Sequence, residues 1–334
     1  MRNRKWVLAD YATGAAGVGT WAMAEDDRPV AGPGQILVRT LWLSVDPYMR
    51  GRLNKPAPGT KGLGIGDVMI GGGVGEVVAS NHPAWRVGDV VESLDIGWQE
   101  HAVLTPDLTG VIRCTRGLPP EAFLSWLGMP GLTAYFGMME VGRPRPGDTV
   151  VVSAASGGVG QIAGQIAKIA GCRVVGIAGS DEKLAWCREI GFDEVINYKT
   201  TDNLTKSLAA CCPDGVDFFY DNTGGEIHDA VLRNLANFAK VVICGRIAVA
   251  NLSANEDIGL RASSRMIATR ATIQGLTMFD WMHRRDEAVK RLSRWRAEKR
   301  LQFREDVLDG FDQVPAAFVR MMSGQNFGKQ LVRL

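Results

Sequence analysis

The segment Thr149–Lys183, TVVVSAASGGVGQIAGQIAKIAGCRVVGIAGSDEK, decides the fold of this chain. A β-branched run, Thr149–Val152, enters a turn of small residues that ends at Gly160, and a helix-like stretch follows the turn. A second apolar run, Arg173–Ala178, completes a strand–turn–helix–strand unit. Such a unit has the order and about the length of a βαβ dinucleotide-binding site.

The turn Ala155–Gly160, ASGGVG, predicts a pyrophosphate site. Gly157 and Gly160 allow the backbone to approach a pyrophosphate and allow the helix to pack closely on the strand, while the helix N-terminus offers N–H groups to the phosphates. The first glycine of the usual G-x-G-x-x-G pattern is replaced by Ala155. The prediction therefore rests mainly on the strands and the helix around the turn, and a purely structural tight turn is the alternative.

The end of the second strand bears on which nucleotide is bound. An NAD site normally carries an acidic residue there, which contacts the ribose 2′-hydroxyl. This chain has Gly179, Ser180 and, just beyond, Lys183. A hydroxyl and a cation suit a 2′-phosphate, so NADPH is favoured. Two alternatives stay open, because Asp181 could reach the ribose after a small shift and Lys183 could be a solvated lysine.

The composition is that of an ordinary globular protein. The chain has 334 residues, enough for about two domains, with 46% apolar residues and a net charge of +2. Such a small net charge gives no reason to expect nucleic acid or membrane partners. The N-terminus has no apolar h-region, and the six cysteines form no C-x-x-C motif. We therefore expect a cytoplasmic protein with reduced thiols.

The sequence offers no cluster of zinc ligands. A zinc-dependent dehydrogenase needs cysteine or histidine ligands arranged around an open position. No cysteine precedes Cys114, and the four histidines are widely spaced: His82, His101, His228 and His283. We therefore expect no catalytic metal.

The sequence pattern changes along the chain and indicates two domains. Residues 1–120 are rich in short apolar runs separated by Gly, Pro and Asn, namely Gln35–Leu43, Met69–Ala79 and Val87–Ser93. That spacing predicts a β-barrel or sandwich domain. Residues 121–300 alternate strand and helix patterns, which predicts a doubly wound parallel sheet. Residues 301–334 end in a turn and a last strand, which is predicted to return to the first domain.

The basic run Arg284–Arg300 could suggest a nucleic-acid site. Its apolar residues Ala288, Leu292 and Trp295 recur at helical spacing, and acidic residues are interspersed among the cations. The pattern favours a solvated amphipathic helix.

With these features in view, the chain resembles the zinc-free medium-chain reductases, and more narrowly the branch of the prostaglandin reductases and plant alkenal double-bond reductases. The motifs that carry the resemblance span nearly the whole chain in the family's order: Leu43–Arg52, Gly128–Tyr135, Ala154–Gly160, Val175–Lys183, Asn197–Lys199, Asp221–Gly225 and Gly324–Val332. The resemblance implies an α/β fold, with a GroES-like β-barrel domain plus a Rossmann domain, and a homodimer. It also implies NADPH-dependent reduction of the C=C bond of α,β-unsaturated aldehydes and ketones.

The resemblance also assigns roles to single residues. It gives nine residues a part in cofactor binding: Gly157, Val159, Gly160, Ser180, Lys183, Tyr198, Asn222, Gly245 and Asn326. The first three would hold the pyrophosphate, the next three the 2′-phosphate and adenosine end, and the last three the nicotinamide half. Phe279 would lie near the substrate pocket, and Tyr48 would face the active site. Plain structural roles are the alternatives for Tyr48, Tyr198 and Asn222.

For an enone, the expected mechanism adds hydride to the β-carbon, and negative charge moves to the carbonyl oxygen. The Tyr48 hydroxyl, the ribose hydroxyl of the cofactor, or both would stabilise this enolate. One departure from the family concerns the proton donor, because Ala250 or a near neighbour stands where many members have a tyrosine. Arg246 and His101 are also unusual at their positions, so substrate preference is expected to differ from that of the mammalian enzymes.

Two other functions stay open at this point. A quinone oxidoreductase shares the scaffold and would use the same cofactor. A dinucleotide-binding protein without robust catalysis is the second alternative, because the segment around Ala250 lacks the family's phenol.

Overall fold

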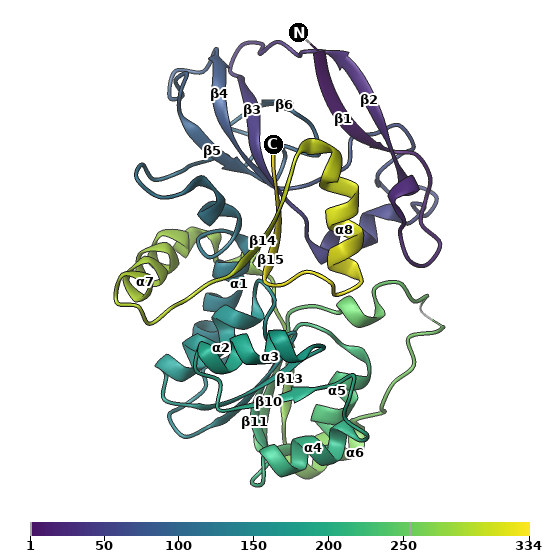
Figure 1. Cartoon of the computed structure of the whole chain (residues 1–334), viewed down its shortest axis with the longest axis vertical. Coiled ribbons are helices and arrows are strands. Elements are labelled where there is room, and N and C mark those ends of the chain that lie inside the picture. Colours follow the sequence, from purple (N-terminus) through teal and green to yellow (C-terminus); the bar gives the residue numbers. More distant parts are fainter. Residues whose placement is uncertain (1, 254) are drawn as a thin grey trace. The chain divides into compact units, whose positions relative to one another are not determined.

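A computed structural model describes residues 2–253 and 255–334 of the chain. The chain forms two compact units, shown in Figure 1. The first unit consists of residues 1–125, 305–326 and 330–334, and the second of residues 126–304 and 327–329. Each unit is described by itself below.

The first unit is built on β-structure. Its main sheet has seven strands in the order β14-β15-β3-β4-β5-β7, with β6 also paired to β3, and a separate two-stranded sheet joins β1 and β2. The strands are β1 (Arg2–Leu8), β2 (Trp21–Asp27), β3 (Ile36–Ser44), β4 (Gly73–Ser80), β5 (Val90–Ser93), β6 (His101–Leu104), β7 (Ile112–Arg113), β14 (Glu305–Asp309) and β15 (Lys329–Arg333). The helical segments are η1 (Val18–Thr20), η2 (Pro47–Leu53), η3 (Pro120–Leu124), η7 (Phe311–Gln313) and α8 (Val314–Met322).

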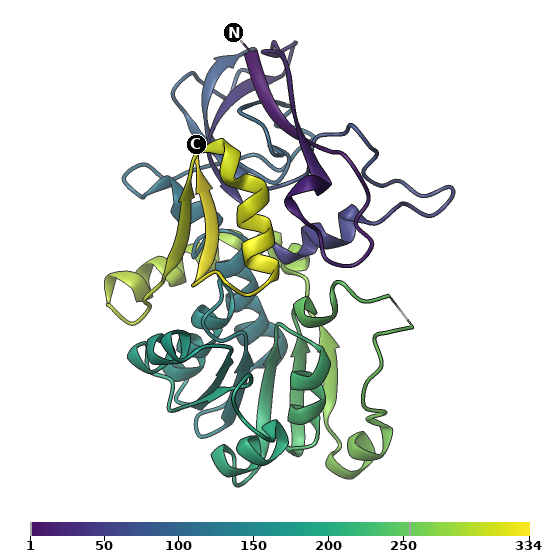
Figure 2. The same ribbon diagram turned by 45° about the vertical axis from the view of Figure 1, so that its right-hand side comes forward.

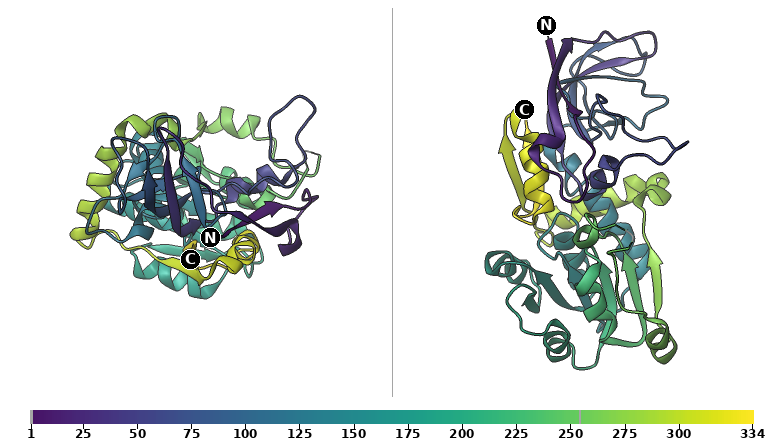
Figure 3. Two further views of the ribbon diagram at one scale, coloured as in Figure 1. Left: turned by 90° about the horizontal axis from the view of Figure 1, so that it is seen from above. Right: turned by 90° about the vertical axis from the view of Figure 1, so that its right-hand side faces the viewer.

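The end of the chain completes this first unit. Strand β15 pairs antiparallel with β3, with Leu331 opposite Ser44 and Val332 opposite Leu43. Helix α8, yellow in Figure 3, buries Phe318 in a core that also contains Trp98. The last strand predicted from the sequence is therefore present, and it returns to the first unit.

The second unit is a six-stranded parallel sheet with helices on both faces, as Figure 2 shows. Its strand order is β10-β9-β8-β11-β12-β13, the order of a doubly wound dinucleotide-binding fold. The strands are β8 (Thr149–Ser153), β9 (Arg173–Ala178), β10 (Glu194–Asn197), β11 (Val216–Asp221), β12 (Leu235–Ile243) and β13 (Thr272–Gly275). The helices are α1 (Met129–Phe136), η4 (Gly137–Gly142), α2 (Gly160–Ile169), α3 (Asp181–Glu189), α4 (Leu204–Cys211), α5 (Gly225–Leu232), η5 (Ile247–Val249), α6 (Ser263–Thr269), η6 (Met278–Arg284) and α7 (Arg285–Ala297).

Helix α7 has the amphipathic form predicted from its sequence. It buries Ala288, Leu292 and Trp295, the three apolar residues at helical spacing. One of its cations, Arg294, pairs with Glu298 at 2.7 Å. Such a pair, four residues apart, is typical of a solvated helix face.

The last helical segment before β8 is not a regular α-helix. Helix α1 continues as the π-helical segment η4. The wider turns coincide with two glycines that lie against the sheet. A Cβ atom on Gly137 would lie 2.5 Å from the Tyr220 hydroxyl, and one on Gly142 would lie 2.3 Å from the Phe218 ring.

Within residues 2–253 and 255–334, no helix is both long enough and apolar enough to cross a membrane.

Candidate dinucleotide site

The turn between β8 and α2 depends on close backbone contact. Ala154 has a φ of +47°, and its carbonyl oxygen accepts a hydrogen bond from the Gly157 N–H at 2.9 Å. A Cβ atom on Gly160 would lie 2.3 Å from that same oxygen and 2.9 Å from the Ala155 Cα. Only glycine fits there, so α2 begins directly against the end of β8. Val159 precedes it as the N-cap, and this helix N-terminus offers N–H groups and the positive dipole end to an anion.

The neighbouring strand accommodates Ala155, which stands in place of the first glycine of the pattern. Its side chain is fully buried. Opposite it, β9 has Gly176, where a Cβ atom would lie 3.0 Å from the Ala155 Cβ and 2.8 Å from the Phe192 ring. The methyl group of Ala155 therefore occupies space that Gly176 leaves open.

The ends of β9 and β10 bring together the residues predicted for the 2′-phosphate and adenosine. Ser180 is the N-cap of α3, and its hydroxyl oxygen accepts a hydrogen bond from the Lys183 backbone N–H at 3.4 Å. The hydroxyl hydrogen stays available for donation to a ligand. Tyr198 is 42% exposed, and its ring covers Gly179, where a Cβ atom would lie 2.9 Å from Tyr198 Cε1.

Asp181, the alternative ribose contact, is held by a neighbour. Its carboxylate accepts a hydrogen bond from the Asn197 Nδ2 at 2.8 Å. This bond ties the carboxylate to the end of β10, while the Ser180 hydroxyl caps the helix beside it.

The ends of β11 and β12 bring together two residues predicted for the nicotinamide half. The Asn222 side chain donates from Nδ2 to the Ser153 carbonyl oxygen at 2.7 Å. A Cβ atom on Gly245 would lie 2.9 Å from the Asn222 carbonyl oxygen, so this close approach requires glycine. Asn222 and Gly245 therefore lie side by side at the carboxyl edge of the sheet, where ligands of doubly wound folds bind.

Lys329 is a residue of this unit that the sequence reasoning did not single out. It is 5% exposed, and its stem lies against Gly158, with Cδ 3.1 Å from where a Cβ atom on that glycine would be. The backbone N–H of Lys329 donates to the Arg304 carbonyl oxygen at 3.1 Å. The signal was present in the C-terminal G-x-N-x-G-K motif, of which only Asn326 was interpreted.

The remaining predicted residues are distributed over both units. Tyr48 in η2 and Asn326 belong to the first unit, whereas Phe279 in η6 belongs to the second and is 57% exposed. Tyr48 is itself 41% exposed. Burial and, to a smaller extent, the Asp46 carboxylate raise the pKa of the Tyr48 phenol above its ordinary value. The phenol therefore stays protonated at neutral pH and can donate a hydrogen bond.

The structure also places the three residues that depart from the family pattern. Arg246 follows β12 and pairs with Asp257 at 2.7 Å. Ala250 ends the short segment η5, so a methyl group stands at that position. His101 begins β6, where burial and the neighbouring Arg28 lower the pKa of its imidazole. His101 is therefore neutral at pH 7.

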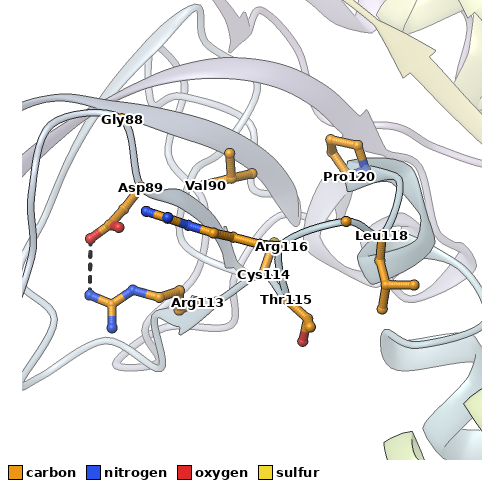
Figure 4. A pocket seen from close by; sticks show the side chains of 10 residues that line it. Gly88, Asp89, Val90, Arg113, Cys114, Thr115, Arg116, Leu118 and Pro120 are labelled. Atoms are coloured by element: carbon orange, nitrogen blue, oxygen red, sulfur yellow. Dashed lines mark hydrogen bonds and ion pairs between the residues drawn. The ribbon is translucent and has the colours of Figure 1, made fainter.

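Groups of possible metal ligands and surface pockets were also considered, and neither involves the predicted residues. In the part of the chain that the structure describes, no three His, Cys, Asp or Glu side chains are grouped so that they could hold a metal ion. A pocket of about 230 Å³, shown in Figure 4, is lined by Asp89, Arg113, Arg116 and their neighbours. None of its lining residues is among those predicted for cofactor or substrate.

Comparison with known proteins gives matches along the whole chain. Residues 4–112 match a family described as the N-terminal domain of oxidoreductase, and residues 158–294 match one described as zinc-binding dehydrogenase. The NADPH-dependent curcumin reductase of Escherichia coli is 38% identical over 339 residues, which cover 100% of this chain and 97% of that protein. Prostaglandin reductase 1 of Oryctolagus cuniculus is 39% identical, covering 98% of this chain and 93% of that protein.

A solved structure is similar over the same length. The crystal structure of CurA from Vibrio vulnificus in complex with NADPH matches with a TM-score of 0.92 and 36% sequence identity. The match covers 99% of this chain and 98% of that one.

Replacing Lys183 should change the choice between cofactors. We expect Lys183→Ala to raise the Kd for NADPH roughly 10-fold or more, because a charge-assisted hydrogen bond contributes about 1.5–3 kcal/mol. The Kd for NADH should change little, since NADH lacks the 2′-phosphate. Titration calorimetry with both cofactors measures the difference.

Lys206 provides a matched control. It stands three residues after the α4 N-cap Asn203, as Lys183 stands three residues after the α3 N-cap Ser180. Lys206→Ala should leave both Kd values unchanged. An equal loss of NADPH and NADH affinity in Lys183→Ala would argue against a contact with the 2′-phosphate.

Proposed function

Since this chain belongs to the medium-chain dehydrogenase/reductase family, in the branch of the prostaglandin, curcumin and alkenal reductases, we propose that it reduces activated C=C bonds with NADPH. The substrates would be α,β-unsaturated aldehydes and ketones. The fold class predicted from the sequence, an N-terminal domain joined to a Rossmann-like domain, is confirmed by this membership.

The observation that carries the proposal is the extent of the similarity. Overall identity of 38–39% is found over alignments that cover 98–100% of this chain, so the similarity is not confined to the nucleotide-binding part. A dinucleotide fold alone would leave the reaction open. The similarity extends over the first unit, where residues 4–112 match the N-terminal domain of oxidoreductase, and this match supports the same reaction class.

The residues of the second unit fit an NADPH molecule. The helix N-terminus at Gly160 would hold the pyrophosphate, because its N–H groups and positive dipole end favour an anion and Gly160 lets the helix begin against the Ala154 backbone. Ser180, Lys183 and Tyr198 would hold the 2′-phosphate and adenosine, and Asn222 and Gly245 would hold the nicotinamide half, together with Asn326. NADPH supplies a hydride to the substrate when it is bound.

The protein would have to stabilise charge on the carbonyl oxygen of the substrate. We assign this role to Tyr48, because its phenol is protonated at neutral pH and can donate a hydrogen bond. A hydroxyl of the cofactor ribose is the second donor available. Phe279, an exposed aromatic residue of the second unit, is proposed to lie against the substrate.

The family membership also supports proposals about the setting. We propose a homodimer that acts in the cytoplasm on small molecules, without nucleic acid or membrane partners. The pairing of the α7 cations with acids of the same helix is consistent with this proposal.

A substrate panel tests the proposed function. NADPH oxidation would be followed with a 2-alkenal, a cyclic enone and a quinone, with NADH in parallel. We expect turnover with the alkenal and the enone, and a clear preference for NADPH. Turnover with the quinone alone would favour the quinone oxidoreductase alternative, and tight NADPH binding without any turnover would favour a non-catalytic protein.

The Tyr48 phenol should matter for turnover and not for cofactor binding. We expect Tyr48→Phe to lower kcat with an enone by about 10²–10³, the usual effect of removing a main oxyanion donor, while the Kd for NADPH stays unchanged. Steady-state kinetics and calorimetry measure the two values. Tyr135→Phe, which removes a hydroxyl that donates to Glu287 at 2.9 Å, is the control. Unchanged kcat in Tyr48→Phe would remove this residue from the mechanism.

A further inference from the structure

Asp221, at the end of β11, is a fully buried carboxylate surrounded by donors. Its Oδ1 accepts hydrogen bonds from the Ser153 hydroxyl at 2.9 Å and from the backbone N–H groups of Thr223 and Gly224 at 2.9 and 3.1 Å. Its Oδ2 lies 2.8 Å from His228 Nδ1. Burial alone would raise the pKa of Asp221, but the hydrogen bonds from His228 and the turn hold it below its ordinary value.

The same serine connects this carboxylate to Asn222. The Ser153 hydroxyl donates to Asp221 and accepts a hydrogen bond from the Asn222 backbone N–H at 2.8 Å. The Asn222 Nδ2 donates to the Ser153 carbonyl oxygen at 2.7 Å. One N–H of the carboxamide is therefore bound within the protein, and this bond fixes the orientation of the Asn222 side chain. Asn222 is fixed by Ser153, Ser153 by Asp221, and Asp221 by His228.

The turn that follows needs such support. Gly224 and Gly225 both have positive φ values, +67° and +62°. Two successive residues in this region make a tight change of direction, and the N–H groups inside it must find acceptors. The Asp221 carboxylate is the acceptor for the first two N–H groups after Asn222.

We propose that the buried Asp221–His228 pair is a positioning element for the nicotinamide half of NADPH, which acts by holding the turn that carries Asn222. This inference rests on the proposed function. It adds Asp221 and His228, two residues to which the proposed function assigns no role. His228 contributes through Asp221 and needs no contact with the cofactor. Its side chain is 22% exposed, whereas that of Asp221 is not exposed at all.

The position of the Asp221–His228 pair in the sheet predicts that only the nicotinamide half of the site depends on it. Strand β8 lies between β9, whose end carries the proposed adenosine site, and β11, whose end carries Asp221. Removing the His228 donor would leave a buried carboxylate without its ionisable partner, and the turn would shift to recover a donor. That shift would act at the end of β11 and leave Ser180 and Lys183 in place.

Binding of two different ligands distinguishes effects on the nicotinamide half of the site from effects on the adenosine half. NADPH covers both halves, whereas adenosine 2′,5′-bisphosphate covers only the adenosine half with its 2′-phosphate. We expect His228→Phe, which keeps a ring and removes the donor, to raise the Kd for NADPH at least fivefold. The Kd for adenosine 2′,5′-bisphosphate should change less than twofold. Asp221→Asn should behave in the same way, and titration calorimetry measures both ligands.

Asp217 provides the control, because it lies near the start of the same strand, where its carboxylate accepts from the Thr149 N–H at 2.8 Å. Asp217→Asn should leave the ratio of the two Kd values unchanged. If Asp221→Asn does not fold, the partly exposed His228 carries the test alone.

Two results would overturn the inference. An unchanged Kd for NADPH in His228→Phe would show that the pair has no influence on the nicotinamide half. An equal weakening of both ligands would show a general structural role. A wild-type protein that binds neither ligand would overturn the proposed function as well, which distinguishes that failure from the other two.

Discussion

The second unit depends on the close approach of α2 to the end of β8. Gly160 stands where any Cβ atom would be within 2.3 Å of the Ala154 carbonyl oxygen, so the helix can begin there only with glycine. This contact directs the helix N-terminus along the carboxyl edge of the sheet, where its N–H groups and dipole favour an anion. Close packing also requires a glycine in the neighbouring strand β9, because Gly176 leaves room for the buried Ala155 side chain.

Around this fixed point, the two sides of the sheet edge have different chemistry. On one side, the ends of β9 and β10 offer a hydroxyl, a lysine and a tyrosine ring, a set that suits recognition of a 2′-phosphate and a base. On the other side, the end of β11 offers an asparagine held by a buried network centred on Asp221. We propose that the first side determines which cofactor is accepted and that the second orients the reactive half of the cofactor. A reductase needs both, because hydride transfer depends on the position of the reacting carbon.

The sequence was sufficient where local patterns decide the structure. The apolar run of β9 and the buried face of α7 followed from the sequence, because each apolar pattern matches the period of the element that it forms. Strand β12, Leu235–Ile243, was different, because it contains an irregular stretch. The register between β11 and β12 shifts there, and Phe238 has a φ of +63°. Such a non-glycine conformation is set by the surroundings and has no signature in the sequence.

In the candidate site, too, some features could be predicted from the local sequence and others depend on the fold. The glycines and the Ser180–Lys183 segment were predictable, because each acts through its own backbone or a neighbour in the sequence. The packing of Lys329 on Gly158 and the pairing of His228 with Asp221 were not, since they join segments whose contact depends on the fold.

We propose that the protein transfers hydride from NADPH to the β-carbon of an α,β-unsaturated carbonyl compound. The most direct measurement uses NADPH deuterated at the transferred position of C4, an enone substrate, and mass spectrometry with NMR of the product. The account predicts a saturated ketone with deuterium on the β-carbon. An allylic alcohol with deuterium on the former carbonyl carbon, or recovery of the enone without deuterium, would contradict it.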